Sequence, residues 1–275
     1  MIVEIIKSII LGIIQGITEW LPISSTGHML LANEFLKMDV SQDFMKMFEV
    51  VIQLGSILAV VVLFFNKLNP FSLKKTGIEK KETWSMWLRV LIGIIPAGII
   101  GILLDDIISE HLGTPFIIAF TLILYGILFI VVESRKMKPN VTEISDLTYN
   151  TALFIGMFQV LALIPGTSRS GATIIGAMLI GTSRIVAAEY SFFMSIPMMF
   201  GASGLRLLKY ILKGAELTST ELSVLIAGSI TAFVVSLVVI KALMSFIKKH
   251  DFKIFGYYRI ALGALVLLYF FVIPK

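Results

Sequence analysis

Long apolar stretches separated by short polar connections make up most of this sequence. Six stretches reach the roughly 20 residues that a helix needs to cross a hydrocarbon core of about 30 Å. The pattern therefore predicts six membrane spans, which we place near residues 44–66, 85–106, 114–134, 186–210, 221–247 and 255–273.

Two further apolar segments are interrupted by polar residues and are not simple spans. Helix, break and return fall at 2–20, 21–27 and 28–37 in the first segment and at 149–163, 164–171 and 172–181 in the second. Non-helical backbone at membrane depth is tolerated only where protein buries it or where it lines a water-filled cavity. We therefore expect two re-entrant helical hairpins whose breaks mark a site.

The order of elements repeats between residues 1–140 and 141–275. In each half a hairpin is followed by a long helix, opened by Phe48-Glu49 or by Glu189-Tyr190, and then by two further helices. Counting spans places the hairpins on opposite faces. In such repeats broken helices meet near the bilayer midplane, and their N-terminal ends favour anions such as phosphate. We predict an all-α polytopic membrane protein, one integral domain (1–275) built as an inverted-topology repeat.

Composition agrees with this fold class. Hydrophobic residues form 57% of the chain and charged residues 15%, and the mean hydropathy is +0.94, outside the usual range for soluble domains. The net charge of +5 needs no nucleic acid to explain it, and the lack of cysteine excludes disulfides and thiolate chemistry. Glu4, Lys7 and Glu19 argue against a cleaved signal peptide at the N-terminus.

Basic residues help to orient the chain. Many of them gather around the 67–84 connection, which we interpret as a solvated, cytoplasmic loop by the positive-inside rule. The first hairpin then enters from the outer face and the second from the inner face. A basic group at 206–213 opposes this trend. Three tryptophans, Trp20, Trp84 and Trp87, are typical of interfacial anchors.

The segment around the first break, Gln15-Gly-Ile-Thr-Glu-Trp-Leu-Pro-Ile-Ser-Ser-Thr-Gly-His28, carries a serine and a histidine suited to catalysis. If Ser25 opens the returning helix, His28 lies one turn on, on the same face. The pair can act as nucleophile and proton carrier. The alternative is a capped helix whose histidine bonds to neighbouring backbone.

Glu19 adds a carboxylate to the first hairpin, where an ionised group is expensive and usually faces a partner or a cavity. It can orient His28, hold a divalent cation, or form an ion pair with Arg169 that has no catalytic role. Gln15 lies on the same helical face and adds an amide.

The segment around the second break, Gln159-Val-Leu-Ala-Leu-Ile-Pro-Gly-Thr-Ser-Arg-Ser-Gly171, carries Arg169 among serine and threonine hydroxyls. Its guanidinium offers two parallel donors that suit phosphate, and hydroxyls with backbone amides complete an anion cradle. The segment lacks the spacing of a Walker loop, and an arginine that snorkels to the interface is the alternative. The residues that we expect to contact the anion are Ser24, Thr26, Gly27, Thr167, Ser168, Ser170 and Gly171. Those that we expect to support the site from the long helices are Glu49, Gln53, Glu189 and Ser195.

These two segments, together with Phe48-Glu-Val-Val-Ile-Gln-Leu-Gly-Ser56, closely resemble the bacitracin-resistance type of undecaprenyl-pyrophosphate phosphatase. The resemblance covers nearly the whole chain. It implies a bacterial inner-membrane hydrolase that converts undecaprenyl diphosphate to the monophosphate carrier for peptidoglycan synthesis, which confers bacitracin resistance. It also implies inverted repeats, a site open to the outer face, and dependence on Mg²⁺ or Ca²⁺.

The resemblance assigns the reaction to residues of both breaks. The family's carboxylate pair falls on Gln15 and Glu19, its serine on Ser25, its histidine on His28 and its arginine on Arg169. Many members have Glu where this chain has Gln15, so Glu19 carries more of the expected cation binding. Membrane lipids are expected partners, and a homodimer is an open alternative to the monomer.

The sequence leaves two mechanisms open. In one, Ser25 attacks phosphorus and His28 exchanges the proton. In the other, water attacks and Ser25 only positions the phosphate. The rival class is a lipid-phosphate transporter, because broken helices at the midplane are also a transporter design. Transport needs no nucleophile, so the presence of a candidate nucleophile favours hydrolysis. A structural scaffold would leave the cost of the buried polar residues unexplained.

Overall fold

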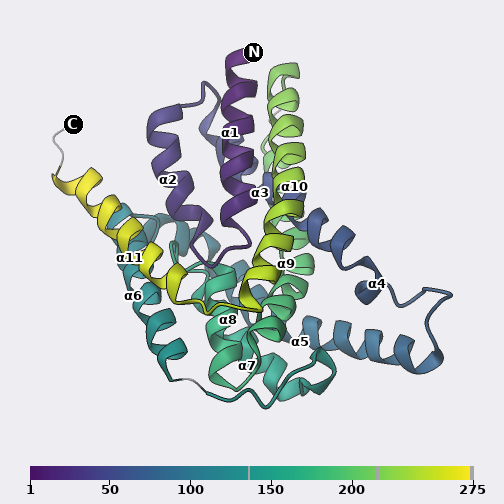
Figure 1. Cartoon of the computed structure of the whole chain (residues 1–275). Helices are drawn as coiled ribbons and strands as arrows, with labels where there is room; N and C mark the ends of the chain where they lie inside the picture. Colours follow the sequence, from purple (N-terminus) through teal and green to yellow (C-terminus); the bar gives the residue numbers. More distant parts are fainter. Residues whose placement is uncertain (136, 215–216, 273–275) are drawn as a thin grey trace.

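The chain folds into helices that pack around a central pair of helix breaks (Figure 1). A computed structural model describes residues 1–135, 137–214 and 217–272, except for the side chains of residues 105, 106, 109 and 110. Within these ranges there is no β-strand, and six helices are long and apolar enough to cross a membrane. They are α3 (Gln42–Leu63), α5 (Gly77–His111), α6 (Pro115–Ser134), α9 (Arg184–Leu212), α10 (Ser219–Ile247), and α11 (Lys253–Leu267) taken together with the turn that continues it to Val272. The predicted all-α membrane fold with six spans is confirmed.

Short elements complete the chain. The first predicted hairpin forms α1 (Ile2–Thr18) and α2 (Ser25–Leu36), and the second forms α7 (Tyr149–Leu161) and α8 (Arg169–Leu179). The remaining elements are α4 (Phe65–Leu68), the 3-10 turn η1 (Ile144–Asp146) and the π-helical turn η2 (Leu268–Val272), which extends α11. The sixth span was predicted to end at residue 273, which lies outside the described residues. In Figure 1 the α1–α2 pair occupies the upper part of the view and the α7–α8 pair the lower part.

Both breaks have the same local structure. Ser24 and Ser168 adopt positive φ angles of 72° and 70°, which are uncommon for residues other than glycine. Each serine caps the following helix, because its hydroxyl accepts a hydrogen bond from the backbone N–H of Gly27 or Gly171. The chain therefore turns sharply and starts a new helix at Ser25 and again at Arg169.

Glycines set the closest helix crossings. α1 packs along α10, and a Cβ atom at Gly12 would lie only 2.6 Å from the carbonyl oxygen of Gly228. α7 packs along α5 in a similar way, with Gly156 against Gly93. Small residues allow helix backbones to approach closely in membrane proteins. Each hairpin is thus held by a span from the other half of the chain.

The prediction that residues 67–84 form a loop was wrong in part. α5 begins at Gly77, eight residues before the predicted start at 85, because Thr76 and Glu79 form a capping box. The prediction for Trp20 was also wrong. Its side chain is fully buried, edge-on to Phe192, rather than at an interface.

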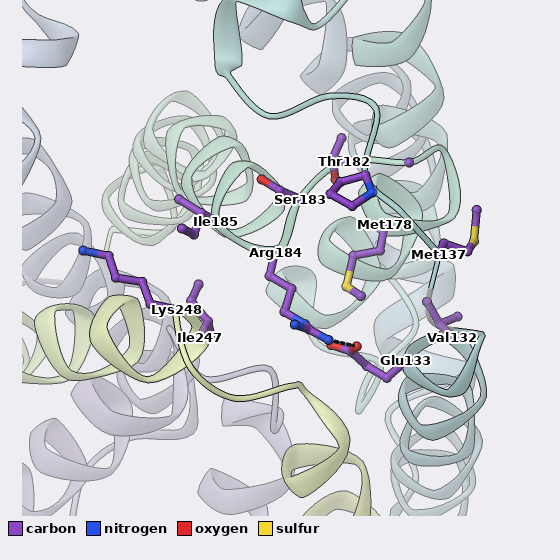
Figure 2. Close-up of a pocket in the computed structure, with 12 residues that line it drawn as sticks. Val132, Glu133, Met137, Met178, Thr182, Ser183, Arg184, Ile185, Ile247 and Lys248 are labelled. Carbon is purple, nitrogen blue, oxygen red and sulfur yellow. Dashed lines mark hydrogen bonds and ion pairs between the residues drawn. The ribbon is translucent and has the colours of Figure 1, made fainter.

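The buried carboxylate of Glu133 connects the ends of three spans, and Figure 2 shows its ion pair with Arg184. Glu133 at the end of α6 accepts two hydrogen bonds, of 2.6 and 2.8 Å, from Arg184 at the start of α9. Its carboxylate also accepts the backbone N–H of Phe252 at the start of α11. The pair lines a cavity of about 240 Å³ at the opposite end of α8 from Arg169. These contacts fix α9, which forms one wall of the site described next.

Candidate active site

The two helix breaks meet at a cavity of about 200 Å³. Its wall draws on both breaks and on the helices α3, α7 and α9. The polar side chains in this wall are Glu19, Ser25, Thr26, Gln53, Gln159, Ser168 and Arg169. Residues from both polar segments therefore line a single cavity.

Glu19 lies at the centre of the polar contacts. It is 7% exposed, and one carboxylate oxygen accepts hydrogen bonds from Gln15 (2.9 Å) and Ser25 (3.2 Å). The other oxygen pairs with Arg169 at 3.3 Å. Glu19 thus links Ser25, the candidate nucleophile of the first break, to the guanidinium of Arg169 in the second. Gln15 turns its amide nitrogen toward Glu19, since a carboxylate accepts but does not donate.

Arg169 is held in place from several directions. Its guanidinium donates to the backbone carbonyl of Ser191 at 2.8 Å and lies over the ring of Trp20, 5.9 Å from the ring centre. Its Nε has no hydrogen-bond partner among the described residues. Because Arg169 is the first residue of α8, its charge adds to the positive end of that helix dipole. Ser25 likewise opens α2, so two helix N-termini and one guanidinium favour an anion here.

The predicted substrate-binding residues divide into two groups. Thr26 and Ser168 line the cavity beside Ser25 and Arg169. Ser168 also caps α8. The others lie behind the wall: Ser24 caps α2, Gly27 packs against Leu122, Gly171 packs against Arg259, and Ser170 donates to the backbone carbonyl of Glu19. Thr167 is buried, with no hydrogen-bond partner for its hydroxyl among the described residues.

His28 faces away from Ser25. Its Nδ1 bonds to the carbonyl oxygen of Ser24 at 2.7 Å, and its Nε2 bonds to the hydroxyl of Tyr258 at 2.7 Å. A carbonyl only accepts, so Nδ1 carries the proton and, in the neutral ring, Nε2 accepts from Tyr258. The rings of His28 and Tyr258 also stack. In the part of the chain that the structure describes, no hydrogen bond joins His28 to Ser25 or Glu19.

The predicted supporting residues lie at different distances from the cavity. Gln53 lines it and donates to the backbone carbonyl of Glu49. Glu49 itself accepts a 2.6 Å bond from Asn33. Glu189 lies elsewhere, paired with Lys67 in a separate cavity of about 480 Å³. Ser195 bonds to the backbone of its own helix, α9.

Arg259 is a residue of the site region that sequence reasoning missed. It is fully buried, and its guanidinium donates to the carbonyl oxygens of Pro22 in the first break and of Gly166 and Thr167 in the second. Further bonds reach the backbone of α6 at Thr121 and Leu122. Arg259 therefore ties the breaks together. A single arginine inside an apolar span is the sequence signal that points to it.

Gln159 is a second residue of the site whose role the sequence does not reveal. Its side chain is 1% exposed and lines the cavity, yet neither end of its amide has a hydrogen-bond partner among the described residues. Buried amides are normally satisfied, so an orphan in a polar cavity points to a bound group. When the two segments are aligned without gaps, Gln15, Ser24 and Gly27 match Gln159, Ser168 and Gly171. At that spacing Leu163 stands where the first segment has Glu19, which explains why Gln159 lacks an internal acceptor.

The residues available for a divalent cation are few. Among the described residues no cluster of three or more Asp, Glu or His side chains is present. Glu19 and the amide oxygen of Gln15 are the candidate ligands, and they suit Mg²⁺, which commonly binds one or two carboxylates together with substrate phosphates and water. Of these two, Glu19 lines the cavity, whereas Gln15 is buried beside it and directs its amide nitrogen at Glu19.

Comparisons with known proteins agree on one family. A family model described as "Bacitracin resistance protein BacA" matches residues 8–265. An undecaprenyl-diphosphatase of Enterococcus faecalis is 57% identical over 265 residues, which is 96% of each chain. Undecaprenyl-diphosphatase 1 of Clostridioides difficile is 58% identical over 99% of this chain and 98% of its own. A Streptococcus thermophilus undecaprenyl-diphosphatase is 54% identical, over 98% of this chain and 94% of its own.

Proposed function

The chain belongs to the bacitracin resistance protein BacA family, and from that premise we propose that it hydrolyses undecaprenyl diphosphate to undecaprenyl phosphate and inorganic phosphate. Relatives named undecaprenyl-diphosphatase match it over nearly their whole length, which supports this activity. Water adds across the phosphoanhydride: a new P–O bond forms at the terminal phosphorus and the bridging P–O bond breaks. The lipid monophosphate returns to peptidoglycan synthesis, and removal of the diphosphate accounts for bacitracin resistance.

The meeting of Ser25, Glu19 and Arg169 in one cavity carries this proposal. A diphosphate in the cavity faces the guanidinium and the N-termini of α2 and α8. These groups stabilise the charge that builds up on the transferring phosphoryl group, which is the main source of catalysis in phosphoryl transfer. Because Arg169 is already held by Ser191 and Trp20, little reorganisation is needed when the substrate binds.

Ser25 is the nucleophile that we propose. Its oxygen attacks the terminal phosphorus, its proton passes to Glu19, and undecaprenyl phosphate leaves as the bridging bond breaks. Water then attacks the phosphoserine, the bond between Ser25 and phosphorus breaks, and the proton held by Glu19 returns to the serine oxygen as phosphate is released. The 3.2 Å contact between Ser25 and Glu19 supports the proton transfer. In the alternative, Glu19 activates water directly, and no phosphoserine appears in rapidly quenched single-turnover reactions.

His28 has a positioning role in this account. Its bond to the Ser24 carbonyl and its contact with Tyr258 support the turn that presents Ser25. His28→Asn keeps a donor near that carbonyl, so we expect a smaller loss of kcat than in Ser25→Ala and an unchanged pH profile. If the profile instead lost a limb with a pKa near that of histidine, His28 would be the proton carrier.

A divalent cation, Mg²⁺ or Ca²⁺, would be held by Glu19 and the amide oxygen of Gln15. When bound it would neutralise phosphate charge. Gln159 lies on the opposite hairpin and offers its amide to the same diphosphate, which accounts for its lack of an internal partner. Binding of the substrate and the cation therefore draws on both hairpins.

We also propose an inverted-topology repeat with two re-entrant hairpins in the bacterial cytoplasmic membrane, with the site open to the outer side. The matched breaks at Ser24 and Ser168 and the exchanged helix crossings support the repeat. The basic 67–84 segment supports a cytoplasmic location for that connection. Cysteine-scanning accessibility in intact cells tests it: a residue of the 67–84 segment labelled from outside would reverse the orientation.

The test compares phosphate release with transport. Purified protein in detergent is given undecaprenyl diphosphate, with and without Mg²⁺ or Ca²⁺, and the same preparation is sealed in vesicles to measure lipid-phosphate flux. We expect cation-dependent phosphate release that falls in Arg169→Ala and persists in Arg135→Ala, an exposed arginine at the end of α6. Flux without phosphate release would favour the transporter.

A further inference from the structure

A groove of about 470 Å³ lies between α5 and α9, and its lining is apolar apart from Arg206 and Lys209. Gly98 of α5 and Pro197 and Gly201 of α9 contribute to its lining. Three residues line both this groove and the catalytic cavity: Leu163, Met198 and Ala202. The polar cavity therefore adjoins an apolar space along one shared wall.

A second apolar groove, of about 450 Å³, lies between α3 and α10 and serves as an internal comparison. It is similar in size, but none of its lining residues belongs to the catalytic cavity. There the two helices touch, since a Cβ atom at Gly55 would collide with the backbone of Ser229. Continuity with the catalytic cavity, rather than apolar character, distinguishes the α5–α9 groove.

We propose that the α5–α9 groove binds the isoprenoid chain of the substrate next to its diphosphate, an inference that rests on the proposed function. Moving a prenyl chain out of an apolar environment costs about 0.8 kcal/mol per CH₂ group. A diphosphate that enters the buried cavity therefore needs an apolar path beside it. The groove volume falls within the range of about 300–1,000 Å³ that is typical of ligand pockets. It accommodates the isoprenyl units nearest the head group, and the rest of the chain extends into the bilayer.

Two glycines of the groove allow it to be filled without disturbing the fold. At Gly98 and at Gly201 a Cβ atom would have no neighbour within 4 Å, and neither residue has a positive φ. Gly98→Leu and Gly201→Leu therefore place a side chain in open space inside the groove. Gly204→Leu is the matched control, because Gly204 is equally open, lies on the same helix as Gly201 and does not line the groove.

The experiment compares a long and a short substrate on each variant. Dimethylallyl diphosphate has one prenyl unit and reaches the cavity but not the groove. We expect kcat/KM for undecaprenyl diphosphate to fall roughly tenfold in Gly98→Leu and Gly201→Leu, the loss that follows when about two CH₂ groups lose their burial. The rate with dimethylallyl diphosphate, and both rates in Gly204→Leu, should stay within about twofold of wild type.

Two results would overturn the groove assignment. One is an unchanged rate with undecaprenyl diphosphate in both groove variants, which would mean that ordinary bilayer lipid fills the space. The other is an equal loss with both substrates, which would mean that the substitutions act on the head-group site. If wild-type protein releases phosphate from neither diphosphate, the proposed function itself fails, and the groove assignment fails with it.

Discussion

The two helix breaks share one backbone design but carry different chemistry. Each turns at a serine of positive φ that caps the next helix through a glycine N–H. The first helical residue is Ser25 in one break and Arg169 in the other. At matched positions the first hairpin has Glu19 and the second has Leu163. In the mechanism that we propose, the first break therefore supplies the reacting residues and the second supplies the phosphate-binding arginine.

The difference also explains the two glutamines. Gln15 donates to Glu19 and is satisfied. Its counterpart Gln159 has Leu163 at the matched position, and its amide lines the cavity without a hydrogen-bond partner among the described residues. Leu163 instead forms part of the wall that the cavity shares with the apolar groove. In the mechanism that we propose, the leucine at this position leaves the amide of Gln159 available to the phosphate and presents an apolar surface to the prenyl chain.

The largest expected effect comes from the second break. Arg169→Ala removes the guanidinium that stabilises the transferring phosphoryl group, and we expect kcat to fall by roughly 10³-fold, in line with other phosphate-binding arginines. Phosphate release from purified protein measures it, with Arg135→Ala as the control. A loss of less than about threefold would mean that Arg169 only snorkels.

Removing the charge of Glu19 in the first break should lower kcat somewhat less than removing Arg169. Glu19→Gln keeps the size and some hydrogen bonds but removes the negative charge that accepts the proton of Ser25. We expect kcat to fall roughly 10²-fold or more and the dependence on added cation to weaken. Glu82→Gln, at an exposed position of α5, is the control. Activity near the wild-type level would assign Glu19 to a structural ion pair.

Arg259 should contribute to the stability of the fold through its contacts with both breaks. Arg259→Met leaves the carbonyls of Pro22, Gly166 and Thr167 without their buried donor. We expect the free energy of unfolding in detergent to fall by about 3 kcal/mol, because each unsatisfied buried group costs about 1–3 kcal/mol and neighbouring groups relax in part. Arg135→Met is the matched comparison. Unchanged stability would show that the breaks hold together without this tie.

The smallest expected effect is at Gln159. Gln159→Leu removes only the amide, so we expect KM to rise roughly tenfold, about 1.4 kcal/mol, with little change in kcat. Gln159→Glu keeps the shape but places a negative charge beside the diphosphate, so its KM should rise further. Equal KM values in wild type and both variants would show that Gln159 does not contact the substrate.

Much of this architecture could be predicted from sequence because apolar length and polar interruptions are local signals. The six spans, both breaks, and the candidates Ser25, Glu19 and Arg169 follow from them. The early start of α5 was also readable, since Thr76 and Glu79 form a capping-box pattern. What the sequence conceals is pairing over long separations. His28 turns to Tyr258, and Arg259 reaches backbone carbonyls, which leave no pattern in the side chains.

The central claim is that the two breaks act on one phosphoryl group, and a double-mutant cycle tests it most directly. Phosphate release is measured for wild type, Ser25→Ala, Arg169→Ala and the double variant. Residues that work as a unit are strongly non-additive, so we predict that the double variant is no more than about tenfold slower than the worse single variant. A loss in the double variant equal to the product of the two single losses would contradict the account.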